Sequence, residues 1–220
     1  MSDPFILRGV TRRAAPTDQT IAASPDGSMV VSSRYQELAQ RGQVFHGLSV
    51  VGGNSFVIYS ATALTFALWN KSTTHNLELI RFTAGYVSGT GVAGPFGYSF
   101  KTDAGFQAAT GSPVAAFADA SSTGIKNAIL GLGNATKATL SNAATTTIVA
   151  APTTNFIPGN MSHLVTTAAD ATNVPFIMED NINGSIIVPP GCLIFPSALL
   201  ASVSLFTMKF TWAEVPIANQ

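Results

Sequence analysis

The sequence predicts an all-β protein, an antiparallel and jelly-roll-like β-sandwich that follows an extended N-terminal arm and includes one or two short helices. Short runs in which apolar and polar residues alternate recur from residue 43 onward, as half-buried strands require. Turn-forming Gly, Asn and Pro separate these runs, and about eight or more short strands with irregular connections favour a sandwich. With 220 residues, the chain can form one sizeable β domain. We therefore expect an arm with a short helix over residues 1–42 and a β-sandwich domain over residues 43–220.

The first part of the chain lacks a periodic apolar face, and its three prolines would interrupt any regular element. This composition predicts an extended arm. One helix is expected at the end of the arm, over Ser33–Arg41. Ser33 and Gln36 form a capping-box pattern, and Gly42 suits the position just after a helix.

All five basic residues of residues 1–42 are arginines, and four acidic residues accompany them. This near balance of charge does not favour binding to nucleic acid. Arginine is favoured at protein interfaces because its planar guanidinium pairs bidentately with carboxylates. We expect the arm to bind a protein partner through Arg8, Arg12 and Arg13.

The segment after the arm predicts strands and turns. Val44–Val51 and Phe56–Ser60 flank the turn Gly52-Gly53-Asn54, a pattern typical of a β-hairpin. Leu64, Phe66 and Leu68 then alternate with Thr65, Ala67 and Trp69, which predicts a strand. A longer alternation over Leu77–Tyr86 predicts another strand. Its expected faces are Ile80, Phe82 and Tyr86 on one side and Arg81 and Thr83 on the other.

The clearest strand pattern lies near the end of the chain. Four large apolar residues occupy every second position, which predicts one buried face of a strand. These residues are Phe206, Met208, Phe210 and Trp212, and the side chains expected to point away are Lys209 and Thr211.

The middle of the chain, about residues 105–158, is rich in Ala, Thr, Gly and Asn and is weakly patterned. One helix is predicted over Thr123–Leu132, where four apolar residues share a helical face. Strands are predicted over Thr145–Ala150 and in short runs near Leu164, Phe176 and Ile186.

One glycine motif matches the spacing of dinucleotide-binding loops. Gly89–Gly94 fits G-x-G-x-x-G, but that fingerprint needs a helix to open at the third glycine so that the helix N-terminus receives the pyrophosphate. Pro95–Phe100 instead indicates a turn and a strand. We therefore expect a loop here and no nucleotide cofactor.

The other residues that could carry chemistry do not form a pattern. His46, His75 and His163 lie far apart without metal-ligand spacing, and no nucleophile-elbow motif is present. Glu179 and Asp180 are adjacent, so on a strand they would point to opposite faces. A solvated turn that also contains Asn181 and Asn183 is expected; a calcium site formed by these four residues is the alternative, but their spacing fits no calcium-binding loop. The single Cys192 is expected to be a buried structural thiol.

The charge content indicates an assembly component. Only 22 of the 220 residues are charged, the net charge is zero, and 44 residues are Ser or Thr. Burying a hydroxyl that finds a partner costs much less than burying a charge, so such a surface suits a protein packed against copies of itself or a scaffold. A neutral chain has no global field to attract nucleic acid or anionic lipid. No signal peptide or membrane span is evident. We expect a non-enzymatic oligomer without cofactor or metal.

Several short motifs resemble a family of small virion structural proteins of tailed bacteriophages. The likeness covers roughly residues 30–217 but is poor over about 105–158. It is carried by Arg34-Tyr35-Gln36-Glu37, the loop Asn70–Leu77, Gly85-Tyr86-Val87-Ser88-Gly89-Thr90, Val188-Pro189-Pro190-Gly191, and Trp212-Ala213-Glu214-Val215-Pro216-Ile217. Related decoration (cement) proteins and fibre heads are commonly trimeric β-sandwiches, and the family implies no catalytic residues.

The resemblance implies a capsid decoration protein that stabilises the head shell. Such a protein would form a homo-oligomer, expected to be a trimer, bind the major capsid protein and reside in the phage particle after synthesis in the host cytoplasm. The alternative is a host-receptor or glycan-binding fibre head. In that role, exposed aromatic residues such as Trp69, Tyr86 and Tyr98 would stack against sugars.

Overall fold

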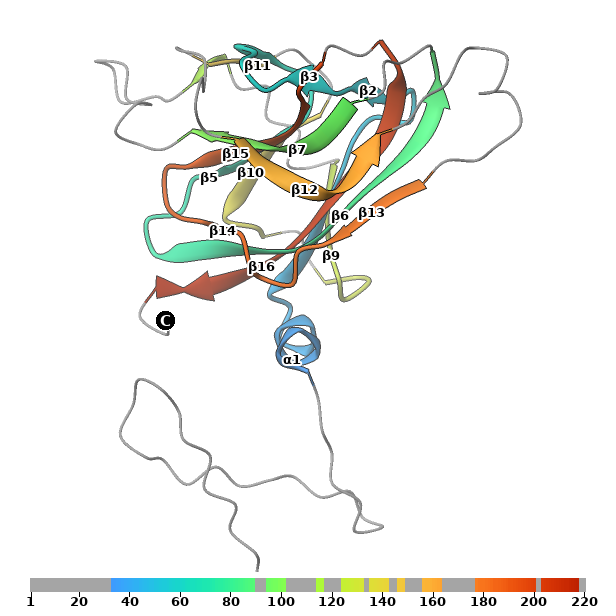
Figure 1. Cartoon of the computed structure of the whole chain (residues 1–220). Helices are drawn as coiled ribbons and strands as arrows, with labels where there is room; N and C mark the ends of the chain where they lie inside the picture. The colour runs from blue at the N-terminus through green and yellow to red at the C-terminus, as the bar shows by residue number, and fades with distance from the viewer. Residues whose placement is uncertain are drawn as a thin grey trace, which may run out of the picture.

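The structure, a computed structural model, is a β-sandwich with one short helix at one end (Figure 1). It describes residues 33–89, 94–101, 114–116, 124–132, 135–142, 146–148, 156–163, 177–200 and 203–217. The described elements are α1 (Arg34–Gln40), β1 (Val44–Leu48), β2 (Asn54–Ser55), β3 (Val57–Ile58), β4 (Ala63–Leu64), β5 (Ala67–Asn70), β6 (His75–Ser88), β7 (Gly94–Lys101), β8 (Val114–Ala116), β9 (Ile125–Asn127), β10 (Ala138–Ser141), β11 (Thr146–Ile148), β12 (Phe156–His163), β13 (Ile177–Asn181), β14 (Ile187–Val188), β15 (Leu193–Ala198) and β16 (Leu205–Pro216).

Two main sheets form the sandwich. The first contains seven strands in the order β13-β6-β16-β1-β9, with β14 added to β6 and β2 added to β16. The second contains six strands in the order β10-β5-β15-β7-β12, with β3 added to β15. Among the described pairings, β3 with β15 is parallel and all others are antiparallel. A small third sheet, β4-β11-β8, lies at the end opposite α1. The expected antiparallel sandwich is confirmed.

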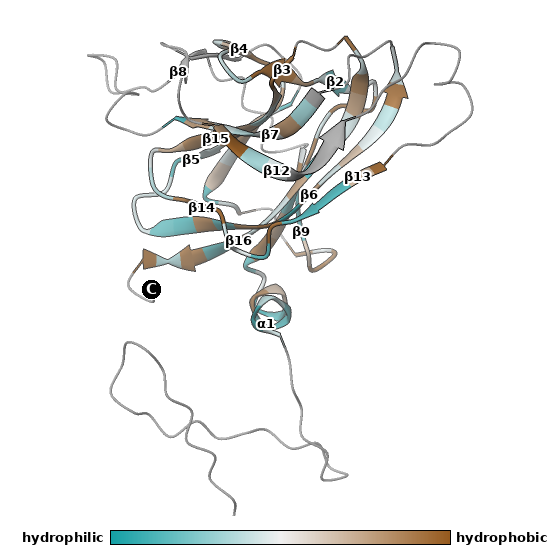
Figure 2. Cartoon of the chain, viewed as in Figure 1, coloured by the Kyte–Doolittle hydropathy of each residue, from teal (hydrophilic) through white to brown (hydrophobic). Residues whose placement is uncertain are grey.

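An aromatic core fills the space between the two main sheets, and apolar segments line the strands of both (Figure 2). Phe82 lies at its centre, with ring centroids 5.0 Å from Phe210 and 5.2 Å from Phe96. Phe56 packs 4.8 Å from Phe206 at the end of the core that lies away from α1. These aromatic contacts join strands from both sheets, so that the two layers are held by one continuous cluster.

The predicted buried face of the terminal strand is confirmed. All four side chains at alternate positions of β16 are at most 1% exposed. Lys209 and Thr211 point to the opposite face as expected. Thr211 is nevertheless buried, because the ring of His46 on the neighbouring strand lies 3.1 Å from its hydroxyl. The four core residues are Phe206, Met208, Phe210 and Trp212.

Strand β6 contains a β-bulge that the expected alternation did not include. On β16, Thr211 pairs with Arg81 and Trp212 pairs with Leu79, so Ile80 has no direct partner on that strand. Ile80 and Arg81 therefore both lie on the outer face, and Phe82 returns to the core. The prediction that Ile80 shares a face with Phe82 is wrong for this reason, whereas the outward placement of Arg81 and Thr83 is confirmed.

Helix α1 covers part of the outer face of the seven-stranded sheet. Ser33 caps its N-terminus and forms the expected capping box with Gln36, and Gly42 adopts the left-handed conformation, at φ 71°, just after the helix. Tyr35, Leu38 and Ala39 pack against a small apolar patch on the sheet. The bulged Ile80 belongs to that patch, together with Val44, Ala213 and Val215.

Two expected local elements are wrong. Val44–Val51 and Phe56–Ser60 do not form a hairpin; β1 pairs instead with β16 and β9, and β3 pairs with β15. The helix expected over Thr123–Leu132 is replaced by β9, in which Ile125 is buried and Lys126 is exposed. In both cases long-range pairing with a core strand overrides the local pattern.

Candidate functional site

The end of the sandwich opposite α1 carries an unusual surface, which we call the charge-free end (Figure 1). It is formed by β2, β3 and β4 and the loops beside them, the end of β6, the start of β7 and the link between β15 and β16. Backbone pairing holds these segments together: Asn54 pairs with Phe206, and Leu205 with Ser88. None of the described residues in these segments is Asp, Glu, Lys or Arg.

Aliphatic side chains are exposed at this end. Val51 is 92% exposed and Val203 is 70% exposed, although both are apolar. Four further aliphatic residues from neighbouring segments are 37–49% exposed: Ile58, Val87, Leu199 and Leu200. Exposed apolar residues in segments without charge are easy to desolvate, and where such residues lie together they mark interaction sites.

The distribution of charged residues along the sequence indicates this surface, although the overall composition does not. Residues 42–70, 82–100, 138–169 and 181–208 contain no Asp, Glu, Lys or Arg. The fold brings parts of these four runs together at one end, through the pairing of β4 with β11 and of β2 with β16. The described charged residues lie elsewhere on the sandwich and on α1.

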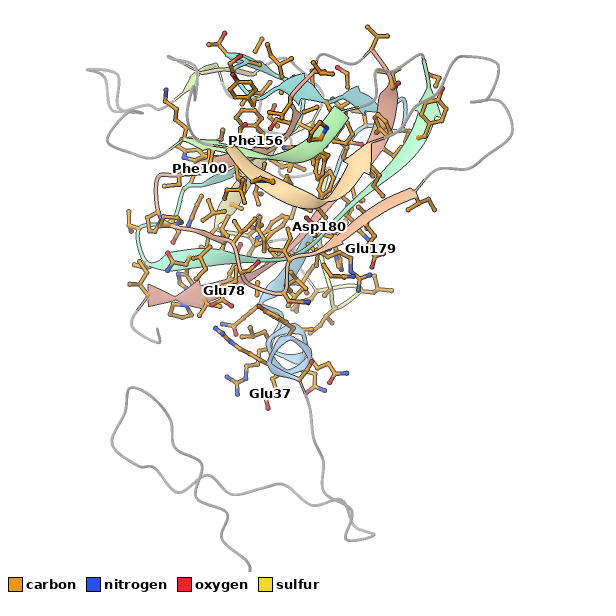
Figure 3. All side chains as sticks on the ribbon, viewed as in Figure 1. Glu37, Glu78, Phe100, Phe156, Glu179 and Asp180 are labelled. Atoms are coloured by element: carbon orange, nitrogen blue, oxygen red, sulfur yellow. The ribbon has the colours of Figure 1, made fainter. Side chains whose placement is uncertain are left out.

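At the other end of the sandwich, the described chain begins at Ser33, the N-cap of α1. Arg34 Nη2 lies 2.6 Å from Oε1 of Glu78, whose side chain is 4% exposed between the sheet and α1 (Figure 3). This ion pair and the packing of Tyr35 and Leu38 attach α1 to the sheet. The expected partner-binding residues, Arg8, Arg12 and Arg13, lie outside the described residues.

Glu179 and Asp180 lie on opposite faces of β13, as expected for adjacent strand residues (Figure 3). The expected solvated turn is wrong at this position, because both residues pair with β6 and Asp180 is only 2% exposed. The hydroxyl of Tyr98 donates a 2.8 Å hydrogen bond to Oδ2 of Asp180. Burial, followed by the nearby charge of Asp180, raises the pKa of Tyr98 and keeps its hydroxyl protonated.

A row of polar side chains crosses the outer face of the seven-stranded sheet beyond α1. Arg81, Thr211, His46 and Lys126 are successive partners across four strands. Burial lowers the pKa of His46, and the positive charges of Lys209 and Arg81 lower it further. Glu179 offsets part of this positive charge, since it lies 3.6 Å from Arg81.

The histidines are not brought together. His46 bonds to Thr211, whereas His75 bonds to the neighbouring Thr74, and the side chain of His163 lies outside the description. Within the described segments, no group of three or more His, Cys, Asp or Glu side chains is placed to hold a metal ion. Cys192 is buried and forms no disulfide, as expected.

The aromatic residues expected at a sugar-binding surface differ in their exposure to solvent. Tyr98 is only 1% exposed and belongs to the core, so this part of the expectation is wrong. Trp69 and Tyr86 are half-buried, and the Nζ atom of Lys71 lies 5.3 Å from the Trp69 ring centroid. The segment after the glycine motif is the strand β7, as expected, although residues 90–93 are not described.

Comparison with protein-family models gives no match, and neither the curated proteins nor the solved structures yield one. In the described part of the chain, no helix has the length and apolar character needed to cross a membrane.

Proposed function

We propose that this chain is a structural protein of a phage particle, a capsid decoration protein that acts as a homotrimer and binds the major capsid protein. The observation that carries the proposal is the charge-free end with its exposed aliphatic residues. The resemblance of the sequence motifs to virion structural proteins supplies the biological setting. The mechanism is mechanical, because burial of this surface across subunit joints raises the free energy needed to separate them.

In this proposal, three copies meet through their charge-free ends. A cyclic contact places the same or adjacent parts of one surface against each other, so any net charge there would repel its own copy. Val51 and Val203 belong to segments whose described residues carry no charge, so they avoid that repulsion. Their burial in the trimer removes apolar area from water at roughly 25 cal/mol per Å².

The helix end then faces away from the trimer axis. Because α1 lies at the opposite end of the sandwich, Ser33, the first described residue, lies far from the proposed contact between copies. The arm, with Arg8, Arg12 and Arg13, would reach neighbouring capsid subunits and pair with their carboxylates. One trimer would thereby connect several subunits of the shell.

Paired substitutions test the trimer contact. Val51→Asp combined with Val203→Asp places charges on the proposed contact without disturbing the core. Light scattering should change from a trimer to a monomer of 22.8 kDa. The matched control is Leu130→Asp, because Leu130 is 93% exposed, like Val51 at 92%, but lies outside the charge-free end. A wild-type protein that is monomeric at micromolar concentration would contradict the proposal.

A second measurement tests the proposed decoration role. The ratio of this protein to the major capsid protein in purified particles should be high, since decoration covers the whole shell. A fibre head would be present in only a few copies per particle. A low ratio would therefore overturn the decoration role while leaving the trimer contact intact.

A further inference from the structure

A cavity of about 610 Å³ lies between the two sheets, away from the charge-free end. Its volume falls in the range of 300–1,000 Å³ that is typical of small-molecule sites. Strands β7, β12, β13, β14 and β15 and the segment 182–189 supply its wall. The wall is mainly aliphatic and aromatic, with Phe100, Ile157, Ile186, Val188 and Ile194 among its members.

Asp180 is the charged member of the described wall. It is 2% exposed, and its Oδ2 atom accepts the 2.8 Å hydrogen bond from Tyr98, which also lines the cavity. A carboxylate has about four acceptor sites, so Asp180 can accept a hydrogen bond from a ligand in addition to the one from Tyr98. Exposed lining residues, including Ile187 and Pro158, place the mouth of the cavity on the surface.

We propose that this cavity binds a small apolar amphiphile, namely an aliphatic chain that carries a cationic or neutral hydrogen-bond-donating headgroup. The chain would lie against the aliphatic wall, where it is removed from water. The headgroup would donate to Asp180, which makes the site selective for charge. This binding site is independent of the proposed decoration role.

The selectivity follows from the cost of burying charge. An ammonium group loses its hydration in the cavity but gains an oppositely charged partner in Asp180, as a buried ion needs. A hydroxyl group can make the same bond as a neutral donor. A carboxylate would instead meet a like charge at short range and is rejected. The expected order of affinity is amine, then alcohol, then carboxylate.

Calorimetric titration with decylamine and decanoate below their micellar concentrations, and with 1-decanol below its solubility limit, tests this order on the full chain. We expect decylamine to bind at least about tenfold more tightly than decanoate, or about 1.4 kcal/mol. Asp180→Asn should remove that preference while alcohol binding remains. Should that variant fail to fold, Tyr98→Phe serves instead; it frees an acceptor site on Asp180 and should increase the preference for decylamine.

Two further variants locate the bound molecule. Ile186→Trp should fill the cavity and abolish binding of all three compounds. Because Cys192 lines the cavity and is the single cysteine of the chain, bound decylamine should slow its modification by iodoacetamide. The control is Leu130→Cys in a Cys192→Ser background, an exposed thiol outside both the cavity and the charge-free end that the amine should not protect.

Three results would overturn the proposal: no measurable binding of any compound, equal affinity for decanoate and decylamine, or unchanged binding in Ile186→Trp. Equal affinity would indicate a headgroup that stays in water at the mouth, away from Asp180. None of these results bears on the trimer contact, because the residues that line the cavity lie outside the charge-free end.

Discussion

Arg34 reaches 2.6 Å from the buried carboxylate of Glu78, although its own side chain is 59% exposed. The guanidinium of Arg34 thus pairs, from the solvent side, with a carboxylate that is almost completely buried on the sheet. Glu78 also pairs across the strands with Ala213 and Ile187. The ion pair ties the first turn of α1 to β6, an inner strand of the seven-stranded sheet.

Arg34→Ala should destabilise the protein by about 1–2 kcal/mol, because it leaves the buried Glu78 without its charged partner. Arg41→Ala is the control at the other end of the same helix and should change stability by less than about 0.5 kcal/mol. Urea unfolding measures both. Equal effects of the two substitutions would show that the ion pair contributes nothing specific.

Phe210→Ala should cost about 3–5 kcal/mol, because it removes a fully buried ring from the aromatic core. Its ring stacks 5.5 Å from Phe66 and also contacts Phe82. Thr207→Ala on the same strand is exposed and should have little effect. Thermal unfolding decides the point: a melting temperature of Phe210→Ala within a degree of wild type would contradict the core assignment.

Gly97→Ala should destabilise the pairing of β7 with β12 by about 1–3 kcal/mol through overpacking. A Cβ atom at Gly97 would overlap the carbonyl oxygen of Ile157 and lie 2.6 Å from Cζ of Phe156. Gly52→Ala is the matched control, because a Cβ there meets no atom within 4 Å. That change should be neutral or slightly stabilising, since it reduces the freedom of the unfolded chain. Chemical denaturation that ranks the two variants in the reverse order would refute this account.

Stability should fall as the pH falls from 8 to 5.5, in part because of His46. Its pKa is lowered in the folded protein, first by burial and then by Lys209 and Arg81. The unfolded chain therefore binds more protons than the folded chain below the ordinary histidine value of about 6.5, which favours unfolding as protons are added. In His46→Gln the loss of unfolding free energy over this range should be smaller. Identical pH profiles for the two proteins would exclude His46 as a contributor.

Deleting residues 2–30 should leave the sandwich and α1 folded with an unchanged thermal transition, yet weaken attachment to phage particles. The deleted segment shows no periodic apolar face that could offset about 1–2 kcal/mol of backbone entropy per ordered residue. Replacing Arg8, Arg12 and Arg13 together by Ala should weaken attachment in the same direction, measured by co-sedimentation. A deletion variant that unfolds would place the arm within the domain, and one that binds as tightly as wild type would remove its docking role.

The sequence predicted strands well where one face is strongly apolar. Along β16 large apolar residues alternate with polar ones, so the buried face is evident without knowledge of its neighbours. In β9 only three residues pair, too few to show a period of two, and the surrounding apolar residues fit a helical spacing equally well. The bulge at Ile80 has no local signature, because it depends on the register with Thr211 and Trp212.

The charge-free end and the cavity were likewise predictable only in part from the sequence. The lack of charge in the runs around Val51 and Val203 is visible in the sequence, but their convergence depends on pairings such as Asn54 with Phe206, 152 positions apart. Asp180 looked like part of a polar turn because its neighbours Asn181 and Asn183 favour turns. Pairing with β6 placed it against Tyr98 instead.

The central position of β16 also orders events during synthesis of the chain. This strand lies between β6 and β1, whose residues leave the ribosome more than a hundred positions earlier. Until residues 205–216 emerge, β6 and β1 expose the edges and apolar faces that β16 will cover, a state prone to aggregation. Nascent chains that stop before this strand would therefore lack a closed sheet, and folding of the domain waits until residues 205–216 are available for pairing.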